Sequence, residues 1–336
     1  GDRRGTAYTR NNLAAASAEE GRLAEAKEAV TDALGIFREL DDPSGVADAL
    51  LNLGAIERQQ GALADARLHL EEALAKKRDL GQRPGEAAAM VALGALALDR
   101  GELSEARSSL EAAAAMARET ASKAVFSNAL AALAEVEIES ADLDRARTRA
   151  EEALAIRREL GRRGKLDESR ILLARIALEA GGLRAVLPDI AALAAENSPG
   201  RSPDLAAAAE FALARANAAL GRVSEARSAL ARGTAFASTS ENLQVRLQAT
   251  AAALATEISG ARPIAGPFEP GAAISLASEK GFRVLALEIE LLHLRNERRS
   301  GRGADAAASL RRIAAEATAR GLLRIARQAE TAAAGD

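Results

Sequence analysis

GALADA at residues 61–66 is followed by GELSEA at residues 101–106, so a glycine, a leucine and an alanine return after 40 residues. Related hexapeptides begin at the same spacing at Gly21, Ala141, Gly181, Gly221 and Gly301. The copy expected at Ala261 is lost in a segment that contains prolines. A period held this often indicates a protein built from internal repeats, in which each unit packs on its neighbours.

Each repeat is predicted to contain two helices. Apolar residues recur at helical spacing over residues 47–56 and again over residues 63–74. Gly61 separates the two runs, because glycine readily takes the left-handed conformation that ends a helix. Pro84 and Gly85 stop the second run. Two short helices cannot bury their apolar faces alone, so stacked pairs would share one continuous core.

The repeat resembles the tetratricopeptide repeat. In that family a Leu-Gly pair in the first helix precedes a turn glycine and two small residues in the second helix. The second repeat carries this pattern at Leu53, Gly54, Gly61, Ala66 and Ala73, and the third at Leu93, Gly94, Gly101, Ala106 and Ala113. The period of 40 residues exceeds the family's usual period of about 34, and Leu50 and Glu57 stand at its aromatic positions. The resemblance implies an all-α fold, a right-handed α-α superhelical solenoid of helix-turn-helix repeats.

Three regions are predicted along the chain. Residues 1–258 should form the repeat array, with about six helix pairs. Residues 259–272 contain three prolines and are predicted to be a loop or hinge. Residues 273–336 should supply a degenerate C-terminal helix pair and a capping helix.

The C-terminal region is predicted in more detail. Its first helix is expected over residues 273–300, and its capping helix over residues 321–334. Arg324, Arg327 and Gln328 are expected to be exposed on the capping helix, because a terminal repeat needs a polar outer face.

The composition argues against several classes of protein. The chain of 336 residues has a net charge of −3, whereas a general nucleic-acid binder carries a basic excess. It contains no cysteine, which excludes disulfides, thiolate metal sites and a cysteine nucleophile. No apolar run approaches the roughly 20 residues that a membrane helix needs, so no membrane insertion is predicted for this chain.

Residues that carry chemistry are scarce. The two histidines, His69 and His293, lie in distant repeats, and each is interpreted as structural rather than catalytic or metal-binding. Gly301 and Gly303 belong to a short glycine-rich segment, but it follows a helix and lacks the lysine of a phosphate-binding loop. We therefore predict no enzymatic activity, no metal site and no cofactor.

A basic cluster closes the second helix of the fourth repeat, at Arg157, Arg158, Arg162, Arg163 and Lys165. These charges could simply complement the carboxyl end of that helix. They could instead form an electrostatic dock for an acidic partner or a nucleic acid. The residues alone leave both readings open.

The resemblance implies that the first helix of each repeat lines a concave binding face. Asn12 and Asn52 hold equivalent positions and could bind a peptide backbone, because an amide side chain both donates and accepts hydrogen bonds. Arg175 and Arg215 are also equivalent, and could hold a carboxylate. The full set of candidate binding residues is Tyr8, Asn11, Asn12, Asp48, Asn52, Arg58, Asn128, Glu135, Arg175, Phe211 and Arg215.

The predicted function is a protein- or peptide-binding scaffold with its ligand in the concave groove. Gly1 to Gly5 match the loop between two repeats, and the style of the repeats resembles bacterial multidomain signalling proteins. We therefore expect the C-terminal interaction or sensor region of a larger bacterial regulatory protein, located in the cytoplasm. The alternatives are a self-associating structural module, which would form homo-oligomers, and a small-molecule-sensing repeat domain.

Overall fold

The computed structural model describes residues 2–161, 163–196, 202–258, 267–301 and 306–335. This part of the chain holds 17 helices and no strand, which confirms the all-α helical repeat fold. The helices are α1 (Arg3–Glu19), α2 (Leu23–Glu39), α3 (Pro43–Gln60), α4 (Leu63–Asp79), α5 (Arg83–Asp99), α6 (Leu103–Glu119), α7 (Lys123–Glu139), α8 (Leu143–Leu160), α9 (Arg163–Ala180), α10 (Leu183–Glu196), α11 (Pro203–Ala219), α12 (Val223–Thr239), α13 (Leu243–Ile258), α14 (Pro270–Lys280), α15 (Arg283–Arg299), α16 (Ala306–Ala319) and α17 (Leu323–Ala334).

Each repeat is an antiparallel helix pair, whose odd-numbered first helix we call helix A and whose even-numbered second helix we call helix B. Helix A of the second repeat ends at Gly61, which has φ 82° and is left-handed. The Gly61 N–H donates to the carbonyl of Arg58, and the Ala62 N–H donates to that of Glu57. The carbonyls at the helix end are thereby satisfied, and the chain reverses within two residues.

Small residues set how closely helices A and B approach. A Cβ atom added at Gly54 would lie 2.7 Å from Cγ of Leu70 and 3.1 Å from the carbonyl oxygen of Ala66. The next repeat has the same geometry, with 2.5 Å between a Cβ at Gly94 and Cγ of Leu110. The Leu-Gly pair of the sequence pattern is therefore a contact between the two helices of one repeat.

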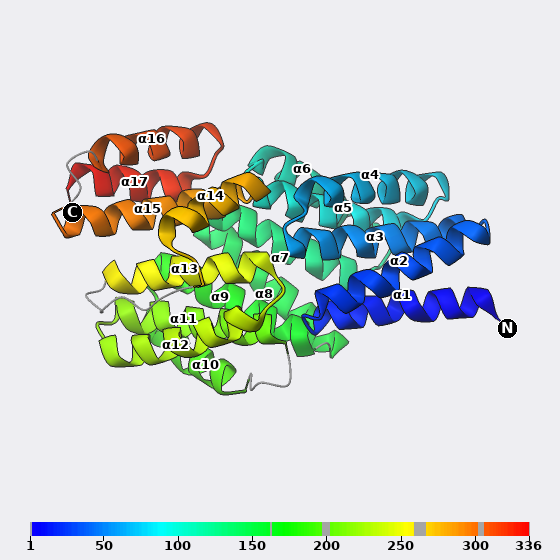
Figure 1. Cartoon of the computed structure of the whole chain (residues 1–336), viewed down its shortest axis with the longest axis horizontal. Helices are drawn as coiled ribbons and strands as arrows, with labels where there is room; N and C mark the ends of the chain where they lie inside the picture. Colours follow the sequence, from blue (N-terminus) through cyan, green and yellow to red (C-terminus); the bar gives the residue numbers. More distant parts are fainter. Residues whose placement is uncertain (1, 162, 197–201, 259–266, 302–305, 336) are drawn as a thin grey trace.

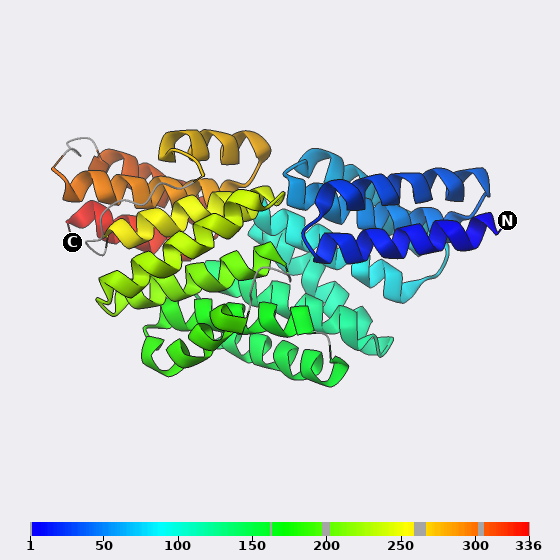
Figure 2. The ribbon, with the colours of Figure 1, turned by 60° about the horizontal axis from the view of Figure 1, so that its bottom comes forward.

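The array curls until later helices A meet earlier ones, as Figures 1 and 2 show. Helix α13 packs on α3, α15 packs on α5, and α17 packs on α7, each five helix pairs further along the chain. We call these three lines of contact the seam. At the seam a Cβ on Gly61 would lie 2.5 Å from Cδ2 of Leu243, and one on Gly101 would lie 3.6 Å from Cδ1 of Leu322.

The C-terminal region differs from the sequence prediction at one helix. Residues 273–300 do not form a single helix, because Gly281 has φ 87° and ends α14 before α15 begins at Arg283. Helix α15 then packs on α13, so the array continues beyond residue 258. Most of the predicted hinge, at residues 259–266, lies outside the described residues.

Candidate ligand cavity

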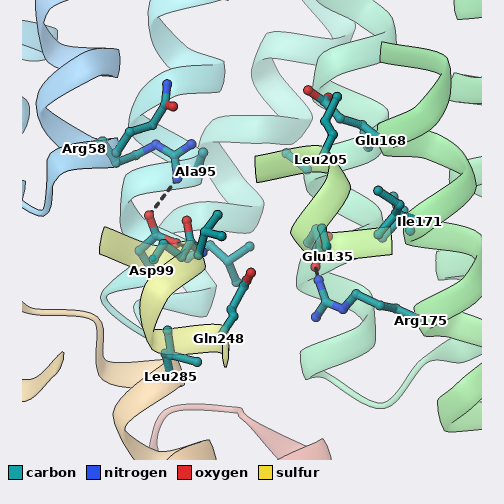
Figure 3. A pocket seen from close by; sticks show the side chains of 18 of the residues that line it. Arg58, Ala95, Asp99, Glu135, Glu168, Ile171, Arg175, Leu205, Gln248 and Leu285 are labelled. Carbon is teal, nitrogen blue, oxygen red and sulfur yellow. Dashed lines mark hydrogen bonds and ion pairs between the residues drawn. The ribbon is translucent and has the colours of Figure 1, made fainter. Parts of the chain in front are cut away.

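A cavity of about 670 Å³ lies inside the curl of the array. Its wall is formed mainly by helices A from α3 to α15, and Figure 3 shows side chains from several of them pointing into one space. Much of this wall is apolar, with Leu51, Ala88, Val91, Ala95, Ala131, Ile171, Leu178, Leu205, Phe211, Val245 and Leu285 among the lining residues. A cavity of this size that combines apolar surface with charged and amide side chains has the usual character of a ligand site.

Polar contacts join distant repeats at one wall of the cavity. Arg58 of α3 donates to Asp99 of α5 at 2.7 Å, and Gln244 of α13 donates to the same carboxylate at 3.3 Å. Figure 3 shows the Arg58–Asp99 pair. Burial raises the pKa of Asp99, and Arg58 opposes that rise. Through its hydrogen bonds with Arg58 and Gln244, the Asp99 carboxylate therefore links the second and third repeats to the seventh across the seam.

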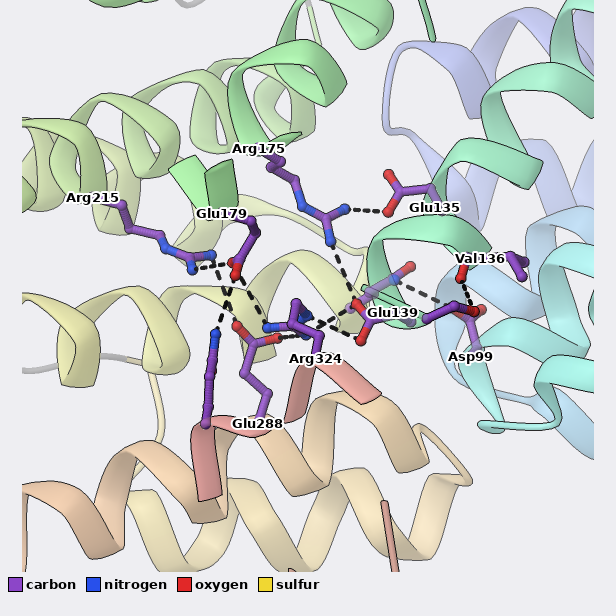
Figure 4. Close-up of polar contacts among 12 residues, drawn as sticks. Asp99, Glu135, Val136, Glu139, Arg175, Glu179, Arg215, Glu288 and Arg324 are labelled. Atoms are coloured by element: carbon purple, nitrogen blue, oxygen red, sulfur yellow. Dashed lines mark hydrogen bonds and ion pairs between the residues drawn. The ribbon is translucent and has the colours of Figure 1, made fainter. Parts of the chain in front are cut away.

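A larger ionic network, centred on Arg324 of α17, lies where the cavity meets the seam (Figure 4). The Arg324 guanidinium donates to both oxygens of Glu139 of α7, at 2.9 and 3.1 Å, and to Glu288 of α15 at 3.3 Å. Glu179 of α9 lies 3.9 Å from it. This geometry is bidentate and charge-assisted, which is the strongest form of protein ion pair.

Two further arginines complete the Arg324 network. Arg175 contacts Glu135 at 2.5 Å and Glu139 at 3.8 Å. Arg215 contacts Glu179 at 3.4 Å and Glu288 at 3.8 Å. Four carboxylates thus meet three guanidinium groups, which leaves the network with one excess negative charge.

The structure corrects the prediction that Arg324 is exposed, since its residue exposure is only 6%. Burial would lower the pKa of Arg324, but Glu139, Glu288 and Glu179 hold it well above the usual value. Arg327 is exposed as expected, while Gln328 is half-buried and donates to Glu179 at 3.1 Å. The last helix is therefore a polar cap on one side only, and its other side joins the seam.

The protonation state of Glu288 should make stability depend on pH. Burial works to raise its pKa, but Arg324, Arg215 and Arg175 outweigh burial and lower the pKa to about 2. A carboxyl whose folded pKa is depressed stabilises the fold above its unfolded pKa, and this contribution is lost as pH falls through the folded value. We expect Glu288→Gln to remove a contribution of about 3 kcal/mol that the parent chain loses between pH 4.5 and about 2.

Urea unfolding of both chains, repeated at several pH values, measures this effect. The free energies of unfolding should converge as pH falls towards 2, because the parent chain then protonates Glu288. Curves that stay parallel from neutral pH to pH 2 would contradict the assignment.

The opposite end of the cavity is basic. Arg157 of α8 is buried, and its guanidinium donates to Asn128 Oδ1 at 3.0 Å, Ser169 Oγ at 2.8 Å and the carbonyl of Lys165 at 3.1 Å. Glu168 lies 3.7 Å from Arg157 and 2.8 Å from Lys165. Two cations therefore share one carboxylate, and in Figure 3 Glu168 lies apart from the Arg58–Asp99 pair.

Six of the eleven predicted binding residues line this cavity. They are Arg58, Asn128, Glu135, Arg175, Phe211 and Arg215. The two arginines proposed to hold a carboxylate already have carboxylate partners within the chain. Whether these six residues contact a ligand stays a prediction.

The other five predicted residues lie outside the cavity wall. Tyr8 packs its ring against Phe37, with centroids 4.8 Å apart, and its hydroxyl contacts Asp42 at 3.3 Å. Asn52 donates to Asn11 Oδ1 at 3.0 Å, so these two amides bind each other. The remaining two differ in setting, since Asn12 is exposed and Asp48 pairs with Lys77 at 2.5 Å.

Several residues of the cavity wall and of the Arg324 network were missed by reading the sequence, and one signal could have found some of them. Asp99, Glu139 and Glu179 stand 40 residues apart, each near the end of a helix A. Acids at the carboxyl end of a helix are unfavourable unless they are paired. The repeated acidic residue at this position therefore predicts cationic partners from elsewhere in the array.

The structure shows the surroundings of His69 and the arrangement of potential metal ligands. His69 Nδ1 lies 2.6 Å from the buried carboxylate of Glu57, which also contacts Lys27 at 3.1 Å. Among the described residues, no group of three or more potential ligands is arranged to hold a metal ion. Over the same residues, no helix is long and apolar enough to cross a membrane.

These observations define an α-helical repeat scaffold that closes around a cavity. The tetratricopeptide-repeat family model matches residues 5–79 and 45–119. The first three helix pairs therefore match the tetratricopeptide repeat. This match supports the predicted resemblance over that part of the chain.

Comparison with solved structures supports the same fold for the rest of the chain. A structure entitled "Crystal Structure of Rap Protein Complexed with Competence and Sporulation Factor" has a TM-score of 0.66 at 12% identity, covering 97% of this chain and 99% of that one. The P58(IPK) TPR domain covers 97% of this chain and 98% of its own at 13% identity, but a TM-score of 0.26 gives it no weight. No curated protein matches the chain significantly.

Proposed function

We propose that this chain is a protein- or peptide-binding scaffold that takes a short segment of its partner into the central cavity. The observation that carries the proposal is the cavity of about 670 Å³, whose wall draws on seven successive helices A. Ligand pockets typically span about 300–1,000 Å³. This volume suits a few residues of extended peptide better than a folded domain.

The shape of the wall supports the same conclusion. The wall combines apolar side chains from α5, α7, α9 and α11 with charged and amide side chains. The apolar surface would supply most of the binding free energy, while the polar groups would fix the direction of the ligand. A small molecule of similar size and polarity would meet the same wall, so small-molecule sensing remains the second candidate.

We also propose a regulatory setting for this scaffold, as the sensor region of a larger bacterial protein of the cytoplasm. The Rap protein of similar fold was solved in complex with competence and sporulation factor. That complex supports the idea that a chain of this fold can hold a separate factor. The 40-residue repeats, which resemble those of bacterial signalling proteins, support the same setting.

Filling the cavity tests the proposal. Ala95 of α5 lines the cavity, and Ala95→Trp should occupy the space that the ligand needs. We expect this variant to bind a random pool of short peptides with free termini at least about tenfold more weakly than the parent chain. Equilibrium dialysis with mass-spectrometric readout measures the retained peptides.

The matched control is Ala112→Trp, which adds the same side chain to an exposed position on α6. The control should retain peptides as the parent chain does. Equal retention by all three proteins would move binding outside the cavity. No retention of any peptide by the parent chain would overturn the peptide-binding proposal itself.

A further inference from the structure

The basic end of the cavity holds a buried arginine, Arg157, that shares the carboxylate of Glu168 with Lys165. Arg157 is 3% exposed, and its three hydrogen-bond acceptors are an amide, a hydroxyl and a backbone carbonyl, all uncharged. Among the described residues its Nε–H has no hydrogen-bond partner. The carboxylate of Glu168 lies 3.7 Å from Arg157 and is already bound at 2.8 Å by Lys165.

Arg324 shows what a neutralised arginine looks like in the same protein. It is also buried, but it is held by carboxylates at 2.9, 3.3 and 3.9 Å. Burial lowers the pKa of Arg157 and only Glu168 opposes this, whereas the carboxylates around Arg324 raise its pKa far above normal. A buried charge whose counter-charge is shared with a second cation is incompletely compensated and costs folding free energy, so its retention suggests a role beyond stability.

Two cations with one carboxylate leave room for a second negative charge from a ligand, and the rest of the cavity limits which ligands can supply it. The wall includes apolar side chains from α5, α7 and α9, and the Arg324 network carries one more carboxylate than guanidinium groups. A ligand with several acidic groups would be repelled at that end. A ligand with one carboxylate and an apolar body would match both ends and the middle.

We propose that Arg157 and Lys165, assisted by Asn128, bind the single carboxylate of the cavity's ligand, which is an apolar peptide with a free C-terminus. This inference rests on the proposed function and names the anchor within that site. The carboxylate would accept hydrogen bonds from the guanidinium and the ammonium group, while Asn128 keeps the guanidinium plane oriented. The apolar side chains of the peptide would then lie along α5, α7 and α9.

Two peptide pools that differ only at the C-terminus test the proposal. One is a random pool of short peptides with free termini, and the other is the same pool with C-terminal amides. We expect the parent chain to bind the amide pool about ten- to a hundredfold more weakly, because a charge-assisted contact is lost. Lys165→Gln and Arg157→Gln should weaken binding of the acid pool and leave binding of the amide pool unchanged.

The control variant is Arg158→Gln, which removes the exposed arginine next to Arg157 on α8. It should bind both pools as the parent chain does. Among the described residues the ammonium group of Lys165 contacts only Glu168, so Lys165→Gln keeps the test valid if Arg157→Gln fails to fold. A third arm with hexanoate, octanoate and decanoate separates a peptide C-terminus from a free carboxylic acid.

Each outcome decides one point. Two results together support the carboxylate anchor. The parent chain binds the amide pool more weakly than the acid pool, and Lys165→Gln binds the acid pool more weakly than the parent chain does. Equal binding of both pools by the parent chain overturns the anchor and leaves peptide binding intact. Binding of the fatty acids in place of both pools overturns the peptide as ligand, and binding of none overturns the proposed function together with the anchor.

Discussion

Replacing Arg324 by methionine should destabilise the chain by about 3–5 kcal/mol, which is the usual cost of removing one partner from a buried ion pair. The substitution leaves Glu139, Glu179 and Glu288 near one another without their shared cation. Methionine keeps most of the volume, so the loss arises from uncompensated charge rather than from a cavity. The result should be the separation of α17 from α7 at the seam.

Urea unfolding and hydrogen exchange together measure this effect. Amides of α17 should lose protection at urea concentrations where α1 to α4 are still protected. Arg327→Met, on the exposed side of the same helix, should change stability by less than about 0.5 kcal/mol. Adding Glu139→Gln to Arg324→Met should recover part of the loss, because one unpaired charge is then removed. A loss below about 1 kcal/mol would mean that the Arg324 network contributes little to closing the seam.

The second large effect is expected at a glycine. Gly61→Ala places a β-carbon on a residue with φ 82°, and that carbon would lie 2.5 Å from Leu243 across the seam. The left-handed conformation costs about 1–2 kcal/mol for a residue other than glycine, and overpacking adds about 1–3 kcal/mol. We expect a total destabilisation of about 2–5 kcal/mol, with α13 pushed away from α3.

Gly221→Ala is the matched control for Gly61→Ala. Gly221 has the same repeat position and φ 72°, but a β-carbon there would meet nothing within 4 Å. The control should show only the backbone cost, and small-angle scattering should report an unchanged radius of gyration. Equal losses in the two variants would show that the seam yields at Leu243 without cost.

The repeat architecture could be predicted because its signals are local. The turn at Gly61, the Leu53-Gly54 pair and the small residues of helix B all act within one repeat, and they appear in the sequence with a fixed spacing. One local signal was misread. Gly281 was taken as part of a continuous helix over 273–300, although it carries the left-handed turn that separates α14 from α15.

The seam could not be predicted, because it depends on how small rotations between successive repeats accumulate along the array. Arg324 therefore seemed exposed on a capping helix, although it meets Glu139, 185 residues away. Arg157 was recognised as part of a basic cluster, but its burial and its contact with Asn128 were not visible in the sequence. Asn52 seemed free to bind a peptide, whereas it donates to Asn11 of the preceding repeat.

The seam also limits how this chain can evolve in length. An open solenoid can gain or lose one unit with little effect, since each unit contacts only its neighbours. Here α3, α5 and α7 meet partners that lie five units further along the chain. Duplicating or deleting one 40-residue unit between them would shift every partner by one position and place Glu139 opposite a residue other than Arg324. Changes in length should therefore be tolerated in whole units only at the ends of the array, and within it only as loop insertions.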